Sequence, residues 1–319
     1  MAKDVCLLLY DVSDEAVREL ADIAPDMDIV RGSRGVIPDE SVLKRVKVVY
    51  NHASKPFLAL LSVPEAKPDW LQLRSAGYDD IDTDAIRAKG ITVTNVRGIH
   101  GTQMSESLFG ILLGRKRALF EAVRNQERAV WHHSDQSGEI TGMTMTIVGA
   151  GAIGRQIARV ATAAFGMTVI GVSRRGQRAP SFARMYKTAD WTDAVRDADI
   201  VLNLLPLNTG THHFFDAGAF RSFKRGAWFV NFGRGATVDT NALLAALEDG
   251  QLEFAALDVF EQEPLPADSP LWGRDDVLVT PHIAGVSAFY EERSFALFKA
   301  NLAAYVKTGK PSQNVIDFP

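Results

Sequence analysis

The sequence predicts an α/β protein with two domains, each built around a parallel β-sheet. Short apolar runs alternate with helix-like segments along the whole chain, as they do in parallel-sheet domains. The stretch GAGAIG, residues 149–154, lies between an apolar run and a helix-like segment. The length of 319 residues and the apolar content of 46% are enough for about two domains with large buried cores.

The first hundred residues are expected to form a small parallel sheet. Its strands are predicted at residues 3–10 (KDVCLLLY), within 46–54 (VKVVYNHAS) and at the start of 69–82 (DWLQLRSAGYDDID). Ser13, followed by Asp14 and Glu15, is typical of a helix start, because a serine side chain caps free N–H groups and acids complement the helix dipole. Strands and helices alternate here, so the sheet should be parallel.

Residues 91–101 (ITVTNVRGIHG) are predicted to be a short strand followed by the crossing into a second domain. A long helix is expected to start near Thr102. Its apolar residues fall roughly on one face: Met104, Leu108, Ile111, Leu119, Ala122 and Val123. That face is larger than one small core requires, so we expect either a dimer contact or packing between the domains.

The glycine stretch predicts a turn that binds a dinucleotide. Gly149 permits a tight turn, Gly151 lets a pyrophosphate approach the backbone, and Gly154 lets the new helix pack closely on its strand. The amide groups and the dipole at the start of that helix favour an anionic ligand. A second apolar run, TVIGVS, ends at Ser173, where this arrangement places the residue that contacts the ribose.

Further elements are expected to complete a doubly wound sheet between about residues 101 and 285. Strands are predicted in DIVLNLL (199–205), AWFVNF (227–232), FAALDVF (254–260) and VLVT (277–280), with a helix in TNALLAALEDG that stops at Gly250. The tail forms a last helix that ends at Gly309. We expect this helix to pack back on the first domain.

Charge, cysteine content and hydropathy exclude several classes of protein. The formal net charge is −4 and no basic run appears, so nucleic acid is not an expected partner. Cys6 is the only cysteine, which excludes intrachain disulfides and a cysteine-based metal site; we expect it in a buried strand and predict no metal site. The sequence has no signal peptide and no apolar stretch long enough to span a bilayer, so we expect a cytoplasmic protein that does not enter a membrane.

The loops that follow the predicted strands of the second domain carry the candidate chemistry, because ligands of an open parallel sheet lie at the carboxyl ends of its strands. These loops supply one arginine, three acids and one histidine: Arg234, Asp258, Glu261, Glu263 and His282. A guanidinium binds a substrate carboxylate and polarises a keto oxygen, and an imidazolium donates a proton to that oxygen as a hydride arrives. A carboxylate beside the imidazole favours its charged form. The set predicts 2-keto acid reduction, although each residue alone is more often a surface ion pair or a packed side chain.

The motifs FVNFGRGATVD, ALDVFEQEPLP and TPHIAG, with GAGAIG upstream, resemble the D-isomer-specific 2-hydroxyacid dehydrogenase family, and its glyoxylate/hydroxypyruvate reductases in particular. AGYDDID resembles the family's substrate loop. The resemblance covers essentially the whole chain and implies two Rossmann-like or flavodoxin-like domains. A discontinuous substrate-binding domain, residues 1–100 and 286–319, would be hinged to an inserted dinucleotide-binding domain, residues 101–285. It also implies a homodimer joined through the cofactor domains.

The resemblance further implies roles for the residues that match the family's motifs. Arg234 would orient the substrate, and His282 would be the proton donor, paired with Glu263 directly before the proline. Asp258 would contact the nicotinamide amide. The expected cofactor-binding residues, of which Pro206 and Thr211 line the adenosine side, are Gly149, Gly151, Ala152, Ile153, Gly154, Ser173, Arg174, Arg175, Leu205, Pro206, Thr211, Phe232, Gly233, Asp258 and Gly285. The expected substrate-binding residues are Ser75, Ala76, Gly77, Arg234 and His282.

The segment GVSRRGQR, residues 171–178, predicts which nicotinamide cofactor is used. An acid at the end of the second strand would accept hydrogen bonds from the ribose hydroxyls and repel a 2′-phosphate. Here Ser173 stands in that place, followed by Arg174 and Arg175 and then by Arg178, which suit phosphate oxygens. We expect NADP(H) as the preferred cofactor and NAD(H) as an alternative. A basic loop that is merely solvated is the competing interpretation.

Two other functions remain open from the sequence. A dinucleotide-sensing binding protein or corepressor would use the same fold, since a fold does not determine function, but it would not need the arginine, glutamate and histidine together. A phosphite-type oxidoreductase is also compatible with the motifs, whereas formate enzymes carry a glutamine where Glu263 stands. The substrate side chain is not predicted. The candidate pocket residues are Tyr78, His100, Met104, Trp131 and Phe289.

Overall fold

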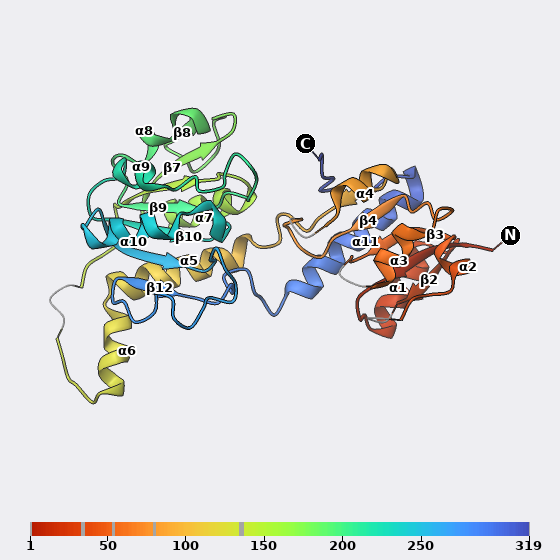
Figure 1. Ribbon diagram of the computed structural model, residues 1–319, viewed down its shortest axis with the longest axis horizontal. Coiled ribbons are helices and arrows are strands. Elements are labelled where there is room, and N and C mark those ends of the chain that lie inside the picture. The colour runs from red at the N-terminus through yellow and green to blue at the C-terminus, as the bar shows by residue number, and fades with distance from the viewer. Residues whose placement is uncertain (1, 33–35, 53–54, 79–80, 134–136, 319) are drawn as a thin grey trace. The chain divides into compact units, whose positions relative to one another are not determined.

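The computed structural model describes residues 2–32, 36–52, 55–78, 81–133 and 137–318. The chain divides into two compact units, Met1–Ile99 with Ala288–Pro319, and His100–Ser287. Each unit contains one sheet in which all neighbouring strands run parallel. The α/β class predicted from the alternating pattern is therefore confirmed (Figure 1).

The first unit has a five-stranded sheet in the order β2-β1-β3-β4-β5, which is the flavodoxin-like doubly wound order. Its strands are β1 (Asp4–Leu8), β2 (Met27–Arg31), β3 (Val46–Tyr50), β4 (Trp70–Gln72) and β5 (Thr92–Thr94). Its helices are α1 (Asp14–Ile23), α2 (Glu40–Leu43), α3 (Lys55–Ser62), α4 (Thr83–Ala88) and α11 (Tyr290–Thr308). The strand β2 was not predicted from the sequence, because this edge strand is only partly buried and lacks an apolar run.

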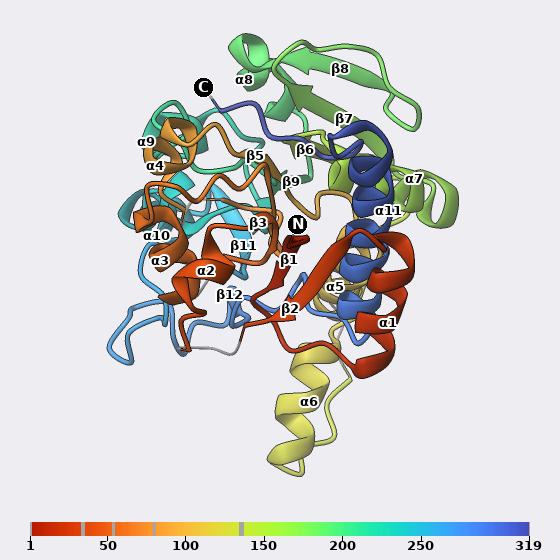
Figure 2. The same ribbon diagram turned by 90° about the vertical axis from the view of Figure 1, so that its right-hand side faces the viewer.

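Both faces of this sheet are covered by helices. Leu8 and Cys6 point to a cluster with Phe298 and Leu302 of α11, and Figure 2 shows α1 and α11 side by side. Val5, Leu7 and Leu9 point to the other face, against α3 and α4. The tail helix thus packs on the first unit as expected, Cys6 is buried as expected, and Ser13 caps α1 by accepting a hydrogen bond from the backbone N–H of Ala16.

Part of two predicted segments lies outside the described residues. These positions are Ala53 and Ser54 of VKVVYNHAS, and Asp79 and Asp80 of AGYDDID.

The second unit has a seven-stranded sheet in the order β12-β11-β10-β9-β6-β7-β8. Its strands are β6 (Thr144–Val148), β7 (Thr168–Ser173), β8 (Arg184–Lys187), β9 (Ile200–Asn203), β10 (Ala227–Asn231), β11 (Leu252–Leu257) and β12 (Val277–Val279). Its helices are α5 (Gly101–Lys116), α6 (Leu119–Glu127), α7 (Ala152–Phe165), α8 (Trp191–Val195), α9 (Ala217–Arg221) and α10 (Thr240–Glu248). The strands β8-β7-β6-β9-β10-β11 follow the Rossmann order 3-2-1-4-5-6, and β12 is one additional edge strand. The strand order reverses between β6 and β9. The edge strand β8 was not predicted from the sequence, because its residues are partly or fully exposed.

The prediction of one long helix from Thr102 onward is wrong, because the structure has two helices there, α5 and α6. The chain turns sharply at Ala118, whose φ of 54° lies in the left-handed region, and α6 then leads away from the sheet (Figures 1 and 2). The turn brings the ring of Phe120 against Gly114, where a Cβ atom would overlap it. Leu119 and Val123 consequently do not share a face with the buried Leu108 but are exposed.

Candidate active site

The three glycines of the GAGAIG turn differ in what surrounds them. Gly149 has φ of 101°, and a Cβ there would lie 2.8 Å from the carbonyl of Leu204. A Cβ at Gly154 would lie 3.0 Å from Ile147 of the preceding strand, so this glycine lets α7 pack closely on β6. A Cβ at Gly151 would have, among the described residues and apart from its chain neighbours, only the carbonyl oxygen of Gly149 within 4 Å, at 4.0 Å. The space next to Gly151 is therefore open to a ligand, whereas the other two positions are filled by the protein.

This turn fits the phosphates of a dinucleotide. Gly151 is the N-cap of α7, and Ala152 after it is exposed. The first N–H groups of a helix have no partner within the helix, and together with the dipole they attract an anion. Gly151 and Ala152, with Ile153 behind them, are the residues that would hold the pyrophosphate.

The end of β7 presents a serine and a group of arginines. The hydroxyl of Ser173 accepts a hydrogen bond from the N–H of Gly176 at 3.2 Å, which closes the turn after the strand. Its hydroxyl proton can still be donated to an acceptor. Arg174, Arg175 and Arg178 are exposed, and no carboxylate among the described residues forms an ion pair with them.

A buried polar network that the sequence analysis missed lies beneath Arg234. Asn203 ends β9 and Asn231 ends β10; Nδ2 of Asn203 donates to Oδ1 of Asn231 at 2.9 Å and contacts the hydroxyl of Thr237 at 2.7 Å. That hydroxyl donates to the carbonyl oxygen of Arg234 at 2.6 Å. The network fixes the backbone of Arg234 at the carboxyl edge of the sheet. The signal for this network in the sequence was an asparagine at the end of each of two apolar runs.

Two neighbouring glycines bring the loop of Arg234 close to other loops. A Cβ at Gly233 would lie 2.6 Å from the carbonyl oxygen of Leu205, and one at Gly235 would overlap the backbone of Phe260. Larger residues would push these loops apart. Phe232, expected to contact the cofactor, is buried in the core of the unit.

The loop after β9 is braced internally. The hydroxyl of Thr211 donates to the carbonyl oxygen of Pro206 at 2.6 Å and accepts from the N–H of Asn208 at 2.8 Å. Leu205 is half-buried and Pro206 is exposed. Of the residues expected to contact the cofactor here, Leu205 and Pro206 are therefore the ones whose side chains remain available to a ligand, because the hydroxyl of Thr211 already forms hydrogen bonds within the loop.

A histidine and a glutamate form a close pair at the same edge of the sheet. Nδ1 of His282 lies 2.7 Å from Oε2 of Glu263, and Oε1 of Glu263 accepts a hydrogen bond from the N–H of Phe260 at 3.0 Å. The side chains are 54% and 36% exposed, respectively. Because Glu263 engages Nδ1, Nε2 is the ring nitrogen that can exchange a proton with a ligand.

The neighbouring acid, Glu261, has different partners. One carboxylate oxygen lies 2.7 Å from Nε2 of His213, and the other accepts from the N–H and the hydroxyl of Thr240. Partial burial raises the pKa of Glu261, but the hydrogen bonds from Thr240 and His213 outweigh this effect and lower it overall. Glu263, and not Glu261, is therefore the acid beside His282.

The carboxylate of Asp258 is buried and holds the loop that carries His282. Asp258 is 2% exposed. It accepts hydrogen bonds from the hydroxyl of Thr280 at 2.6 Å and from the N–H groups of Ile283 and Ala284 at 2.9 Å each.

His100 lies against the same loop from the start of α5. A Cβ at Gly285 would lie 3.3 Å from Cδ2 of His100. Burial, and then the positive charge of Arg234, lower the pKa of His100, so the charged form of its imidazole is disfavoured. Met104 on the same helix is buried in the core, and Trp131 lies fully exposed on the segment after α6.

The expected substrate loop lies in the first unit. The hydroxyl of Ser75 donates to the carbonyl oxygen of Gly77 at 2.7 Å, and Asn95 donates to that of Ala76 at 2.6 Å. The sequence analysis missed Arg74 just before it, at the carboxyl end of β4.

The side chain of Arg74 is largely buried. It pairs with Glu291 of α11 and lies 3.2 Å from the ring centroid of Tyr10. Its carbonyl oxygen accepts a hydrogen bond from Tyr290 at 2.6 Å. The tail helix therefore braces the start of the loop. Tyr78 and Phe289, the other two candidates, also belong to this unit.

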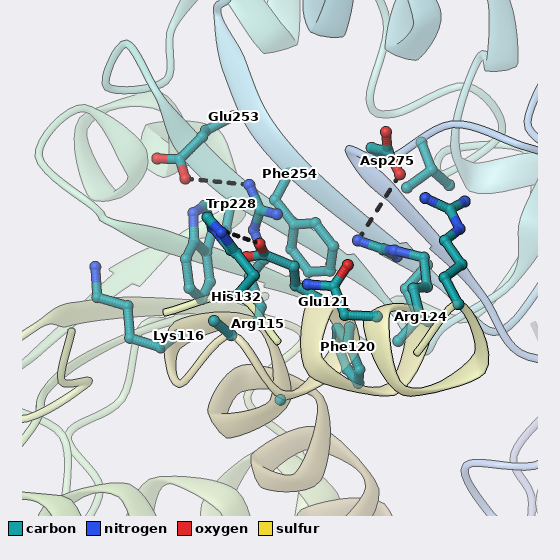
Figure 3. A pocket seen from close by; sticks show the side chains of 16 residues that line it. Arg115, Lys116, Phe120, Glu121, Arg124, His132, Trp228, Glu253, Phe254 and Asp275 are labelled. Atoms are coloured by element: carbon teal, nitrogen blue, oxygen red, sulfur yellow. Dashed lines mark hydrogen bonds and ion pairs between the residues drawn. The ribbon is translucent and has the colours of Figure 1, made fainter. Parts of the chain in front are cut away.

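A cavity of about 810 Å³ lies at the opposite, amino-terminal edge of the second sheet (Figure 3). Trp228, Phe254 and Val277, from the starts of β10, β11 and β12, line one side, and residues of α5 and α6 line the other. Ion pairs at 3.4–3.7 Å cross its wall: Arg115–Glu253, Arg124–Asp275 and His132–Glu121. This cavity is not formed by the catalytic loops, which lie at the carboxyl-terminal edge.

The fold and the glycine turn define a dinucleotide-binding α/β protein, and comparisons with known proteins identify its family. Residues 109–284 match the model described as "D-isomer specific 2-hydroxyacid dehydrogenase, NAD binding domain". The chain is 36% identical over 223 residues to glyoxylate/hydroxypyruvate reductase B of Escherichia coli, which covers 69% of this chain and 68% of that one. The chain belongs to the D-isomer specific 2-hydroxyacid dehydrogenase family.

Solved structures agree with this assignment. A family member from Aeromonas salmonicida is 34% identical, with a TM-score of 0.83 and full coverage of both chains. A 2-hydroxyacid dehydrogenase from Xanthobacter autotrophicus in complex with NADPH and MES is 26% identical, with a TM-score of 0.79 and 98% coverage of both chains. The protein is thus an oxidoreductase of this family that uses a nicotinamide dinucleotide, which confirms the expected family and class of cofactor. No helix among the described residues is long and apolar enough to cross a membrane.

Proposed function

We propose that this protein reduces a small 2-keto acid to the D-2-hydroxy acid, with NADPH as the preferred reductant. The observation that carries the proposal is the 2.7 Å contact between His282 and Glu263 at the sheet edge that also holds Arg234. A proton donor and a carboxylate-binding cation at one edge are what reduction of a keto acid requires. Glyoxylate and hydroxypyruvate are the first substrates to test, because the similar E. coli protein is named for them.

In this mechanism Arg234 binds the substrate carboxylate with its guanidinium fork and polarises the keto oxygen. The nicotinamide, when bound, supplies the hydride. His282 donates a proton from Nε2 to the developing alkoxide. Glu263 holds the ring through Nδ1 and stabilises the imidazolium before transfer. In the oxidative direction the same imidazole accepts the proton.

Ser173, Arg174 and Arg175 support the preference for NADPH. A 2′-phosphate on the ribose would meet the free proton of the Ser173 hydroxyl and exposed guanidinium groups without competing carboxylates among the described residues. Guanidinium groups bind phosphate through two parallel hydrogen bonds. NAD(H), which lacks that phosphate, would bind without these contacts.

We assign substrate binding to the first unit and cofactor binding to the second. The loop of Ser75, Ala76 and Gly77 presents backbone N–H groups suited to a carboxylate, and its carbonyl groups are held by Ser75 and Asn95. The glycine turn and the arginines after β7 belong to the second unit.

The protein is further proposed to be a homodimer joined through its second unit. Leu119, Val123, Val130 and Trp131 are each at least half exposed, and Trp131 is completely so. Exposed apolar residues clustered on one helix and the segment after it are typical of an interface. In a two-fold dimer the same surface is buried on both subunits.

The test is the oxidation of NADPH, followed by its absorbance, with glyoxylate, hydroxypyruvate and pyruvate. Turnover of at least one of them supports the proposal, and the product from hydroxypyruvate or pyruvate should be the D-isomer, whereas glycolate from glyoxylate is achiral. Phosphite with NADP⁺ is included in the panel, because its oxidation in the absence of keto acid turnover would replace keto acid reduction as the function. Binding of NADPH without turnover of any of these compounds would instead indicate a dinucleotide-sensing protein.

A further inference from the structure

We propose that Asp258 and Thr280 are positioning residues that set the orientation of the His282 imidazole. This inference rests on the proposed function of His282 as the proton donor. It assigns Asp258 a role in addition to the contact with the nicotinamide amide that the family resemblance implies.

The first observation is the number of hydrogen bonds that the Asp258 carboxylate accepts from one short loop. Oδ1 accepts from the hydroxyl of Thr280 and the N–H of Ile283, and Oδ2 accepts from the N–H of Ala284. The three donors lie on both sides of His282. A carboxylate that is 2% exposed requires such bonds, because a buried charge without them is strongly unfavourable. The carboxylate and the loop therefore stabilise each other.

The backbone of Asp258 connects His282 to the sheet. The N–H of Asp258 donates to the carbonyl oxygen of Asn231, the last residue of β10, at 3.1 Å, and its own carbonyl oxygen accepts from the N–H of His282 at 2.9 Å. The N–H of Thr280 donates to the carbonyl oxygen of Leu257 at 3.0 Å. His282 is thus tied through Asp258 to a central strand rather than to a free loop.

The conformation of His282 shows what this arrangement maintains. Its φ of 54° lies in the left-handed region. A residue other than glycine keeps this backbone conformation only when the surrounding structure holds it there. This conformation places Nδ1 at 2.7 Å from Oε2 of Glu263. A relaxation to an extended backbone would rotate the ring away from Glu263 and move Nε2 from the position at which it meets the substrate.

The chemistry of the donors distinguishes a carboxylate from an amide at position 258. A carboxylate only accepts hydrogen bonds, and here its partners are one hydroxyl and two N–H groups. An asparagine would direct an NH₂ group at some of these donors. Thr280 offers a milder test, because valine has nearly the same shape but no hydroxyl, and serine retains the hydroxyl without the methyl group.

The experiment compares Thr280→Val, Thr280→Ser and Asp258→Asn in the full-length enzyme. We expect Thr280→Val to lower kcat about 10- to 100-fold, the effect of a displaced catalytic group, with the KM for the keto acid and the Kd for NADPH unchanged. Thr280→Ser should restore most of kcat. Asp258→Asn should lower kcat further. The ring ¹⁵N resonances of His282 should change in Thr280→Val and return in Thr280→Ser.

A kcat for Thr280→Val equal to that of the wild-type enzyme would overturn the inference, as would an effect confined to the Kd for NADPH, which would mean that Asp258 acts on the cofactor. If Asp258→Asn does not fold, the two threonine variants still test the inference, because they retain the carboxylate. His282→Asn is measured in parallel. If His282→Asn keeps full turnover, the proposed function of His282 fails; if it is inactive while Thr280→Val is fully active, only the positioning role fails.

Discussion

Nδ1 of His282 and Oε2 of Glu263 lie 2.7 Å apart, although 18 positions separate the two residues in the chain (264–281). Glu263 lies in the loop after β11 and His282 in the loop after β12, and these strands are neighbours in the sheet. Parallel neighbours bring their carboxyl ends to one edge, so the sheet itself creates the pair.

His282→Asn should lower turnover of the keto acid by about 10²- to 10⁴-fold, the usual contribution of a positioned proton donor. Binding of NADPH should remain close to that of the wild-type enzyme, as measured by quenching of protein fluorescence. His133→Asn is the control, since His133 is an exposed histidine of the same unit. Unchanged turnover in His282→Asn would exclude it as the donor.

Glu263→Gln should lower kcat for keto acid reduction by about 10-fold, a milder effect than loss of the proton donor itself. The reductive step needs the imidazolium, and an uncharged amide stabilises that cation less than a carboxylate does. The measurement is kcat with a keto acid at saturating NADPH. Glu261→Gln is the matched control, because Glu261 contacts His213 and Thr240 instead, and its kcat should stay unchanged. A kcat of Glu263→Gln equal to that of the wild type would remove Glu263 from the pair.

Arg234→Ala should raise KM and lower kcat together, because the guanidinium holds the carboxylate in the ground state and the developing negative charge in the transition state. Arg234→Lys should recover little of either, since lysine keeps the charge but not the two-pronged geometry. Steady-state kinetics with glyoxylate measure both constants. Near wild-type kinetics in the lysine variant would mean that the site requires only a positive charge.

The double variant Arg174→Ala and Arg175→Ala should bring the preference for NADPH over NADH close to unity. A hydrogen bond to a charged group contributes about 1.5 to 3 kcal/mol, so one engaged arginine favours NADPH by roughly 10- to 150-fold. Kinetics with NADH should hardly change. Arg196→Ala, at an exposed arginine paired with Asp193, is the control. A wild-type enzyme that prefers NADH would contradict this interpretation of the loop.

Trp131→Ala should weaken the proposed dimer. Trp131 is the most exposed large apolar side chain of the described residues, and large aromatic residues contribute most to interfaces. Sedimentation velocity over a range of concentrations should therefore show a dimer for the wild-type protein and a larger fraction of monomer for the variant. Leu58→Ala, at an exposed leucine of the first unit, should have no effect. A wild-type protein that is monomeric at all concentrations rules the dimer out.

The sequence alone determined the elements that depend on local pattern. Apolar runs and turn residues located most strands, Ser13 marked the start of α1, and the spacing of Gly149, Gly151 and Gly154 indicated the dinucleotide turn with its order of strand, glycines and helix. These features are visible locally because strand and helix periods, caps and tight turns depend on residues only a few positions apart. The residues that would react were also found in the sequence, because each follows the carboxyl end of a strand.

Only the tertiary structure decided how the strands are ordered and what holds the reactive side chains. The edge strands β2 and β8 escaped prediction because exposure on one side removes their apolar pattern, and the helix break at Ala118 depends on the packing of Phe120 against Gly114. The bonds from Asn203 to Asn231, and from Asp258 to the loop of His282, join residues that are 20 or more positions apart. Such contacts form only when strands distant in the chain become neighbours, since a buried polar group must find its partner wherever the fold places one.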